Sequence, residues 1–243
     1  MHRPYPAPST QFDMRQTWHD LLFMHWPVSV DALRPHIPSS LTIDTFDDTA
    51  WIAVVPFRMS GVYPRGLFPV PWLSAFAELN VRTYVTKDGK PGVWFFSLDA
   101  ANGLAVQIAR TWFSLPYFHA RMTCATQGDG IRYASERIHL RAPSAQLDCE
   151  YAPASDIFEA KPGSIEWFLT ARYCLYTSRR GRLLRGEIEH LAWPLQIAQA
   201  EVRVNTMTAP HAINLPDTRP LLHFARKLDV QVWGLKPADP PSE

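Results

Sequence analysis

Several polar residues of this chain stand inside otherwise apolar segments, and their side chains are of the types that bind or transform small organic molecules. A carboxylate in an apolar setting can act as a general acid or base, and a phenol beside it can donate a hydrogen bond to a carbonyl oxygen. A guanidinium binds a ligand carboxylate through two parallel hydrogen bonds. On these grounds we predict catalytic roles for Glu78 and Tyr117, and ligand-binding roles for Arg110, Arg172, Asn80, His25 and His190.

Glu78 and Asn80 lie in a stretch of alternating character, residues 74–86. A period of two places successive side chains on opposite faces of a β-strand. The stretch therefore predicts a strand with one apolar face on a core and the other face toward water or a polar cavity. The apolar face carries Ala75, Ala77, Leu79, Val81 and Val85, and the other carries Phe76, Glu78, Asn80, Arg82 and Tyr84.

Each of these polar residues also has a purely structural interpretation. Glu78 would then be an anchor paired with Arg82 or Arg110, and Tyr117 would be a packed aromatic at the start of a strand. Arg110 lies near the C-terminal end of a helix that Asn102 is expected to cap, where it would complement the helix dipole. In this interpretation the polar groups only satisfy one another inside the protein.

Arg172 and the two histidines have similar alternatives. Arg172 follows Ile165 by seven residues, on the apolar face of a helix that Ser164 is expected to cap. Its side chain then either extends to solvent or points into a cavity. His25 and His190 are flanked by aromatic or apolar residues, a setting more often occupied by core histidines with one hydrogen bond.

Turn chemistry and periodicity predict the elements around these residues. Lys87-Asp88-Gly89-Lys90 predicts a tight hairpin, because Asp-Gly tolerates the positive φ that such turns need. About ten strands and two or three short helices are expected in all. We therefore predict an α+β fold in which a large antiparallel sheet curls or closes, as a single domain over residues 1–243 with a core of about 15–235 and flexible termini.

The composition excludes several classes of partner. Lys and Arg number 24 against 23 Asp and Glu, so bulk electrostatics favour neither nucleic acid nor an anionic membrane. No apolar run approaches the ~18 residues of a transmembrane helix, and a cytoplasmic location is expected. The three cysteines form no CxxC, and no HxH or HExxH occurs. We therefore predict no metal and no cofactor.

Motifs along the chain resemble, in order, a YqjF-type family of uncharacterised bacterial proteins. They cover roughly residues 15–235 and are HWPVSVDALRPHIPSSLTID, WIAVVPFRM, FAELNVRTYV, GKPGVWFFSLDA, LPYFHARM, WFLTARYCLY and EHLAWPL. That family is similar in fold to acetoacetate decarboxylase, whose pattern is resembled by VDALR, by the Glu of AELN and by Arg110 six residues before Pro116. The resemblance implies a double-layered, cone-like β-barrel around a central cavity.

The chemistry of the decarboxylase is not implied. That enzyme needs a Schiff-base lysine directly after the proline and a second lysine that makes the first nucleophilic. Tyr117 and Phe118 occupy those two positions here, and only Glu78 matches an acid of the decarboxylase pocket. The lysines of this chain lie in turns, in loops or near the C-terminus: Lys87, Lys90, Lys161, Lys227 and Lys236. The sequence therefore argues against acetoacetate decarboxylation through an imine.

Two classes of function remain open. The first, which we favour, is a binding protein or sensor whose barrel encloses a small, partly apolar organic molecule, with a ligand carboxylate held by Arg110 or Arg172. The second is a lysine-independent hydratase, isomerase or hydrolase for a small oxo-acid, with Glu78 as acid/base and Tyr117 as oxyanion donor. The sequence decides neither the ligand nor whether the chain is a monomer or a homo-oligomer.

Overall fold

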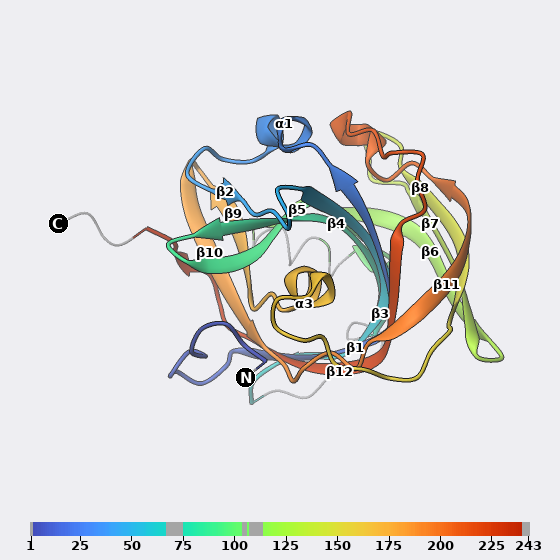
Figure 1. The fold of residues 1–243 in the computed structure, drawn as a ribbon, viewed down its shortest axis with the longest axis horizontal. Helices are drawn as coiled ribbons and strands as arrows, with labels where there is room; N and C mark the ends of the chain where they lie inside the picture. Colours follow the sequence, from blue (N-terminus) through green and yellow to red (C-terminus); the bar gives the residue numbers. More distant parts are fainter. Residues whose placement is uncertain (1, 67–74, 104–105, 107–113, 240–243) are drawn as a thin grey trace.

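A computed structural model describes residues 2–66, 75–103, 106 and 114–239. Within these residues the chain forms a 13-stranded sheet with a few short helical turns (Figure 1). The strands are β1 (Met14–Val28), β2 (Thr42–Ile43), β3 (Ala50–Pro64), β4 (Phe76–Lys87), β5 (Lys90–Ala100), β6 (Tyr117–Gln127), β7 (Gly130–Arg137), β8 (Gln146–Pro153), β9 (Cys174–Arg179), β10 (Arg182–Glu189), β11 (Gln196–Asn205), β12 (Leu221–Val232) and β13 (Lys236–Pro237). The helical turns are α1 (Val30–Leu33), η1 (Arg34–His36), α3 (Ile165–Thr170) and η2 (Ala209–His211). None of the described helices has the length and apolar character needed to cross a membrane.

The sheet closes on itself twice. Both rings share the run β5–β4–β3–β1–β12, which we call the shared wall. In the smaller ring, β9 and β10 connect β5 back to β12, and in the larger ring β6, β7, β8 and β11 make that connection on the other side (Figure 1). The predicted closed, double-layered barrel is therefore confirmed. Its sheet is mixed rather than wholly antiparallel, because β5 runs parallel to both β6 and β9.

The shared wall separates two apolar interiors, because successive side chains of a strand point to opposite faces. On β3, for example, Val55 packs in the smaller ring and Val54 in the larger one. The alternation in β1 is interrupted near Asp20, whose φ of 53° coincides with a break in the pairing to β3. This β-bulge lets both Trp18 and Leu21 face the smaller ring, although their spacing in a regular strand would place them on opposite faces.

The alternation predicted before the Asp-Gly hairpin is confirmed in β4. Leu79 is fully buried in the apolar core of the larger ring, whereas Glu78 and Arg82 face the interior of the smaller ring. The hairpin joins β4 to β5 with φ values of 51° at Asp88 and 70° at Gly89. Positive φ at both central residues matches the twist of the flanking strands.

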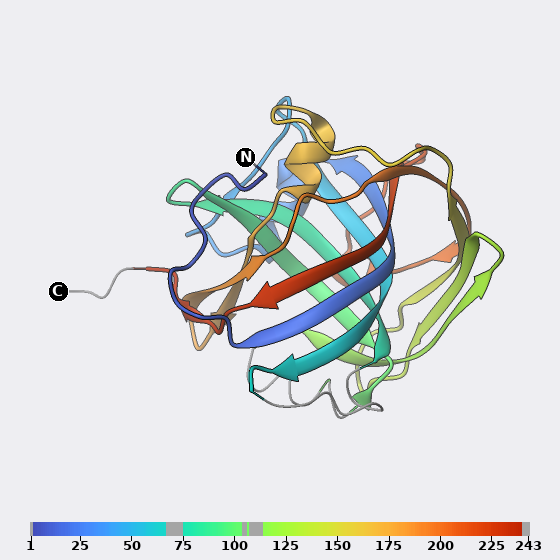
Figure 2. The same ribbon diagram turned by 90° about the horizontal axis from the view of Figure 1, so that it is seen from below.

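Helix α3 lies across one end of the smaller ring (Figures 1 and 2). Ser164 caps it as predicted, since the Ser164 hydroxyl accepts a hydrogen bond from the Trp167 amide at 3.2 Å. The prediction that Arg172 lies on a face of this helix is wrong. The helix ends at Thr170, and its C-cap Ala171 has left the helical conformation with φ −79° and ψ 60°. Arg172 therefore stands on the short connection from α3 to β9.

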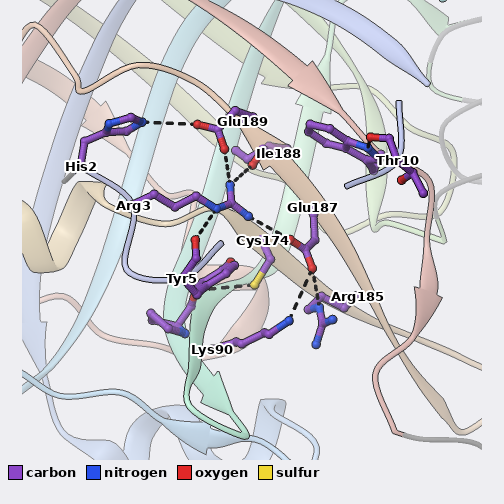
Figure 3. Close-up of polar contacts among 12 residues, drawn as sticks. His2, Arg3, Tyr5, Thr10, Lys90, Cys174, Arg185, Glu187, Ile188 and Glu189 are labelled. Carbon is purple, nitrogen blue, oxygen red and sulfur yellow. Dashed lines mark hydrogen bonds and ion pairs between the residues drawn. The ribbon is translucent and has the colours of Figure 1, made fainter. Parts of the chain in front are cut away.

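The N-terminal segment, residues 2–13, is tied to β10 (Figure 3). The guanidinium of Arg3 is 5% exposed and donates to the carboxylates of Glu187 and Glu189 at 2.9 and 2.8 Å. It also donates to the carbonyl oxygen of Ile188 at 2.6 Å. The Ile188 side chain lines the interior of the smaller ring. Arg3 therefore contacts the backbone of the cavity wall from its outer side.

Candidate ligand-binding site

The smaller ring encloses a cavity of about 410 Å³. Most of the side chains that line it are apolar, and its aromatic walls are Trp18, Phe57, Phe76, Phe95 and Trp193. The rings of Trp18 and Trp193 stack with their centroids 5.9 Å apart. An interior cavity of this size, mostly apolar with a few polar groups, is typical of sites for small organic ligands.

Glu78 is buried on the cavity wall, and the hydroxyl of Tyr117 donates to its carboxyl group across 3.2 Å. Burial raises the pKa of Glu78 to about 8, although hydrogen bonds from Tyr117 and Asn80 oppose that rise. Burial, and then the neighbouring Glu78, raises the pKa of Tyr117 well above its ordinary value. At neutral pH the pair therefore holds its protons and can donate to a ligand oxygen.

Asn80 and Arg82 follow Glu78 along the same face of β4. The side-chain amide of Asn80 contacts Glu78, and its Oδ1 is buried with no hydrogen-bond partner among the described residues. The guanidinium of Arg82 lies over the rings of Phe23 and Tyr84, at 5.6 and 5.9 Å from their centroids. Both residues are buried, so their polar groups face the cavity rather than the protein surface.

Arg82 carries a charge that the described protein does not balance. No described carboxylate lies within ion-pair distance of its guanidinium, and its Nε is buried without a hydrogen-bond partner. Glu78 is thus not its ion-pair partner, which removes one of the structural interpretations of Glu78. Sequence reasoning placed Arg82 on the polar face of its strand but did not select it as a ligand-binding residue. The sequence feature that could have indicated Arg82 as a ligand-binding residue was its position four residues after Glu78, on the same face of the strand.

Arg172 also lines the cavity, but its charge is paired. Its Nη1 donates to the carboxylate of Asp44 at 2.5 Å, and its Nε donates to the carbonyl oxygen of Phe168 at 2.7 Å. Its guanidinium lies 4.9 Å from the centroid of the Tyr84 ring. Since Arg82 lies over the same ring, one end of the cavity holds two guanidinium groups, and the carboxylate of Asp44 pairs with one of them.

The two predicted histidines differ in position. His190 lines the cavity, stacks on Tyr173 with ring centroids 4.4 Å apart, and donates from Nδ1 to the carbonyl oxygen of Leu191 at 2.6 Å. Burial lowers its pKa to about 4, so the imidazole is neutral. His25 is fully buried but is not among the described cavity-lining residues. Its Nε2 lies 2.6 Å from the hydroxyl of Tyr84, so it supports the aromatic ring on which the arginines lie.

Two further predictions concern residues beyond this cluster. Arg110, and most of the helix predicted after Asn102, lie outside the described residues. In the described part of the chain no group of three or more His, Cys, Asp or Glu side chains is arranged to hold a metal ion.

The fold is similar to that of several solved structures. An acetoacetate decarboxylase-like enzyme from Sphingomonas wittichii RW1 matches with a TM-score of 0.65 and 10% identity, over 98% of this chain and 99% of that one. Acetoacetate decarboxylase from Legionella pneumophila matches with a TM-score of 0.63 and 9% identity, over 97% and 92%. The enduracididine biosynthesis enzyme MppR, in complex with pyruvate, matches with a TM-score of 0.62 and 10% identity, over 97% and 94%. The protein therefore has an acetoacetate decarboxylase-like fold.

Within that fold class, the chain belongs to the DUF2071 family, described as uncharacterized conserved protein, which matches residues 15–229. It is 49% identical over 223 residues to the uncharacterized protein YqjF of Bacillus subtilis (strain 168), covering 92% of this chain and 91% of that one. The predicted resemblance to a YqjF-type family is thus confirmed.

Proposed function

We propose that this protein binds a small organic carboxylate in the cavity of the smaller ring, with Arg82 as the group that holds the carboxylate. The observation that supports this most directly is the buried guanidinium of Arg82, which has no carboxylate partner among the described residues and whose Nε has no hydrogen-bond partner there. Burying a charge without a partner costs on the order of several kcal/mol of folding free energy. A counter-charge supplied by a ligand lowers that cost. A ligand carboxylate supplies that charge and accepts two parallel hydrogen bonds from a guanidinium.

The surroundings of Arg82 favour an anion over a neutral ligand. Arg172 lies against the same ring of Tyr84, and its only described acidic partner is Asp44. Two guanidinium groups beside one carboxylate leave a positive end in a cavity whose walls are mostly apolar. A low-dielectric setting strengthens the attraction of that end for an anion. The similar structure of MppR holds pyruvate, which is a small carboxylate.

Imine chemistry has no support in the described site. No lysine is among the described residues that line the cavity. Lys87 and Lys90 lie at the β4–β5 hairpin, where their amines lie near the carboxylates of Asp239 and Glu187, at 2.9 and 3.9 Å. Tyr117 stands where the resemblance places the Schiff-base lysine, and a phenol cannot form an imine.

A thermal-shift screen tests the binding function. Wild-type protein would be heated with small oxo-, hydroxy- and aryl-carboxylates, beside Arg82→Gln and the control Arg121→Gln, which removes an arginine whose side chain is 72% exposed. A ligand at a hundredfold excess over its Kd stabilises by about 2.7 kcal/mol. We expect at least one carboxylate to raise the Tm of the wild type and of Arg121→Gln but not that of Arg82→Gln. Equal shifts in all three proteins would overturn the proposal.

A second candidate function is supported by the protonated pair Glu78 and Tyr117. A carboxyl group that keeps its proton near neutral pH can act as a general acid toward a carbonyl oxygen, and the phenol can stabilise the charge that develops there. In that case Glu78→Gln should lower turnover of a bound oxo-acid by about a hundredfold or more, as loss of such a donor does, while its Kd changes little. If no bound carboxylate is converted by the wild type, the protein is a binder and this second candidate fails.

A further inference from the structure

The polar groups of the cavity are divided between two separate ends. Glu78 and Arg82 are four residues apart on one face of β4, so their Cα atoms lie about 13 Å apart at the usual rise of a strand. The break in β4–β5 pairing between Val81 and Arg82 adds its extra residue on β5, since Val81 pairs with Ser97 and Arg82 with Phe95. The spacing along β4 itself is therefore regular.

The two side chains have their contacts in different places. The guanidinium of Arg82 lies over the rings of Phe23, on β1, and of Tyr84, the next residue of the same strand face beyond Arg82. The carboxyl group of Glu78 contacts the hydroxyl of Tyr117, on β6. The cationic end and the neutral, proton-donating end are therefore separate, with Asn80 between them on the same face of β4.

From this separation we propose the class of ligand: a monocarboxylate that carries a second, uncharged oxygen about five or six bonds from its carboxyl carbon, joined by an apolar chain or ring. The inference rests on the proposed carboxylate-binding function and deepens it. The carboxylate lies on Arg82, and the distal oxygen accepts a hydrogen bond from the protonated carboxyl group of Glu78, to which the Tyr117 hydroxyl already donates. Side chains of a strand stand roughly perpendicular to the sheet, so the two groups keep about the spacing of their Cα atoms. Allowing about 2.8 Å for a hydrogen bond at each end then leaves roughly 7 Å for the ligand to span.

Short oxo-acids do not reach both ends. In pyruvate the ketone and the carboxylate are on adjacent carbons, and in acetoacetate one carbon separates them, so either compound contacts Arg82 or the Glu78–Tyr117 pair. The cavity volume of about 410 Å³ also far exceeds what a three- or four-carbon acid fills. The aromatic side chains of Phe57, which pairs with Glu78, and of Phe95, which pairs with Arg82, supply apolar surface beside the two ends.

A matched ligand series tests the proposal by isothermal titration calorimetry. Pyruvate and 4-oxopentanoate are short oxo-acids, 6-oxoheptanoate has the predicted spacing, and heptanoate has the same length without the distal oxygen. For the wild type we expect 6-oxoheptanoate to bind at least tenfold more tightly than each of the other three. Comparable binding of 4-oxopentanoate and 6-oxoheptanoate would overturn the inference.

Variants at the two ends separate this inference from the function on which it rests. Glu78→Met removes the donor and keeps an unbranched side chain, whereas Glu78→Gln keeps a donor. The tenfold preference for 6-oxoheptanoate over heptanoate should fall below twofold in Glu78→Met and persist in Glu78→Gln. Arg82→Gln should weaken every carboxylate tenfold or more. If Arg82→Gln changes nothing, or no carboxylate of the series binds the wild type, the proposed function fails together with the inference. If Arg82 matters but chain length and Glu78 do not, the inference alone fails.

A second measurement covers the case in which Glu78→Met does not fold. In the wild type the preference for 6-oxoheptanoate over heptanoate should decline as the pH rises above about 8, where Glu78 loses its proton. The same preference should stay constant in Glu78→Gln. An unchanged preference in the wild type across this range would show that Glu78 is not the distal donor.

Discussion

Arg82 and Arg172 place their guanidinium groups against one aromatic ring, that of Tyr84, but among the described residues only Arg172 has a carboxylate partner. The distances to the ring centroid are 5.9 Å for Arg82 and 4.9 Å for Arg172, and the ion pair of Arg172 with Asp44 measures 2.5 Å. The two arginines thus differ in their contacts with the rest of the described protein. Arg172 joins the end of α3 to Asp44, whereas Arg82 pairs with no described carboxylate.

The first prediction concerns the stability of the two arginine variants. Arg172→Met leaves the Asp44 carboxylate without its partner and should lower the free energy of unfolding by about 2–3 kcal/mol, less than the roughly 3–5 kcal/mol for a fully buried pair because Asp44 is partly exposed. Arg82→Met removes an unpaired buried charge and should raise that free energy by about 1 kcal/mol or more. Urea denaturation of both variants measures the difference. Equal destabilisation would mean that Arg82 has a protein partner.

The second prediction is a pH dependence of stability that Glu78 causes. Burial raises the pKa of Glu78 from 4.5 to about 8. Between these values the unfolded chain has released this proton and the folded chain retains it, so the free energy of unfolding falls as the pH rises. Below pH 4.5 both states hold the proton, and above pH 8 neither does. The difference in Tm between Glu78→Gln and the wild type should therefore change in favour of Glu78→Gln from pH 5 to pH 8. Above pH 8 this difference should stay constant.

Thermal unfolding across this pH range checks the prediction. Glu136→Gln, at a side chain that is 48% exposed, provides the control. A constant difference in Tm between Glu78→Gln and the wild type would show that Glu78 is ionised in the folded protein at neutral pH.

The third prediction compares two ion pairs that differ in burial. Arg137 donates from two nitrogens to the carboxylate of Asp99 at 2.7 Å each, and both side chains are at most 1% exposed. Asp99→Asn should cost about 3–5 kcal/mol of stability, because it leaves the buried guanidinium uncompensated. Glu136→Gln breaks the exposed pair with Arg121 and should cost less than about 1 kcal/mol. Denaturant unfolding of Asp99→Asn and Glu136→Gln under the same conditions measures the two losses of stability. Similar losses would contradict the burial of the Arg137–Asp99 pair.

The fourth prediction concerns the closure of the smaller ring at Gly92. A Cβ on Gly92 would lie 2.6 Å from the Sγ and 2.8 Å from the carbonyl oxygen of Cys174, at the parallel contact of β5 with β9. Gly92→Ala should therefore destabilise the protein by about 1–3 kcal/mol, as overpacking of a buried site does. At Gly234 the nearest atom to an added Cβ is 3.4 Å away, so Gly234→Ala is the matched control. If Gly92→Ala is as stable as the wild type, β9 lies farther from β5 than the contact between Gly92 and Cys174 indicates.

Local patterns in the sequence predicted much of what positions the site. The alternation of β4 placed Glu78 and Asn80 on the polar face correctly, because a period of two depends only on the strand itself. The Asp-Gly hairpin and the Ser164 cap were likewise local features. The double-layered barrel came from the family resemblance and not from these patterns, since ring closure through β9 and β12 joins segments far apart in the chain.

The parts that the sequence could not predict depend on non-local contacts. That no described carboxylate lies within ion-pair distance of Arg82 depends on which side chains the opposite walls present, so strand periodicity alone could not select this arginine. The pairing of Arg172 with Asp44 joins positions 128 residues apart, and the early end of α3 at Thr170 moved Arg172 off the helix. The anchoring of Arg3 by Glu187 and Glu189 is equally remote in sequence.

The central claim is that the charge of Arg82 holds the carboxylate of the ligand, and a cycle of four binding constants tests it most directly. A carboxylate that stabilises the wild type and its uncharged primary amide would each be titrated into the wild type and into Arg82→Gln. A charged hydrogen-bonded pair contributes about 1.5–3 kcal/mol, so the acid should bind the wild type at least tenfold more tightly than the amide. In Arg82→Gln that preference should disappear. If Arg82→Gln retains the full preference for the acid, the carboxylate binds elsewhere and the account is wrong.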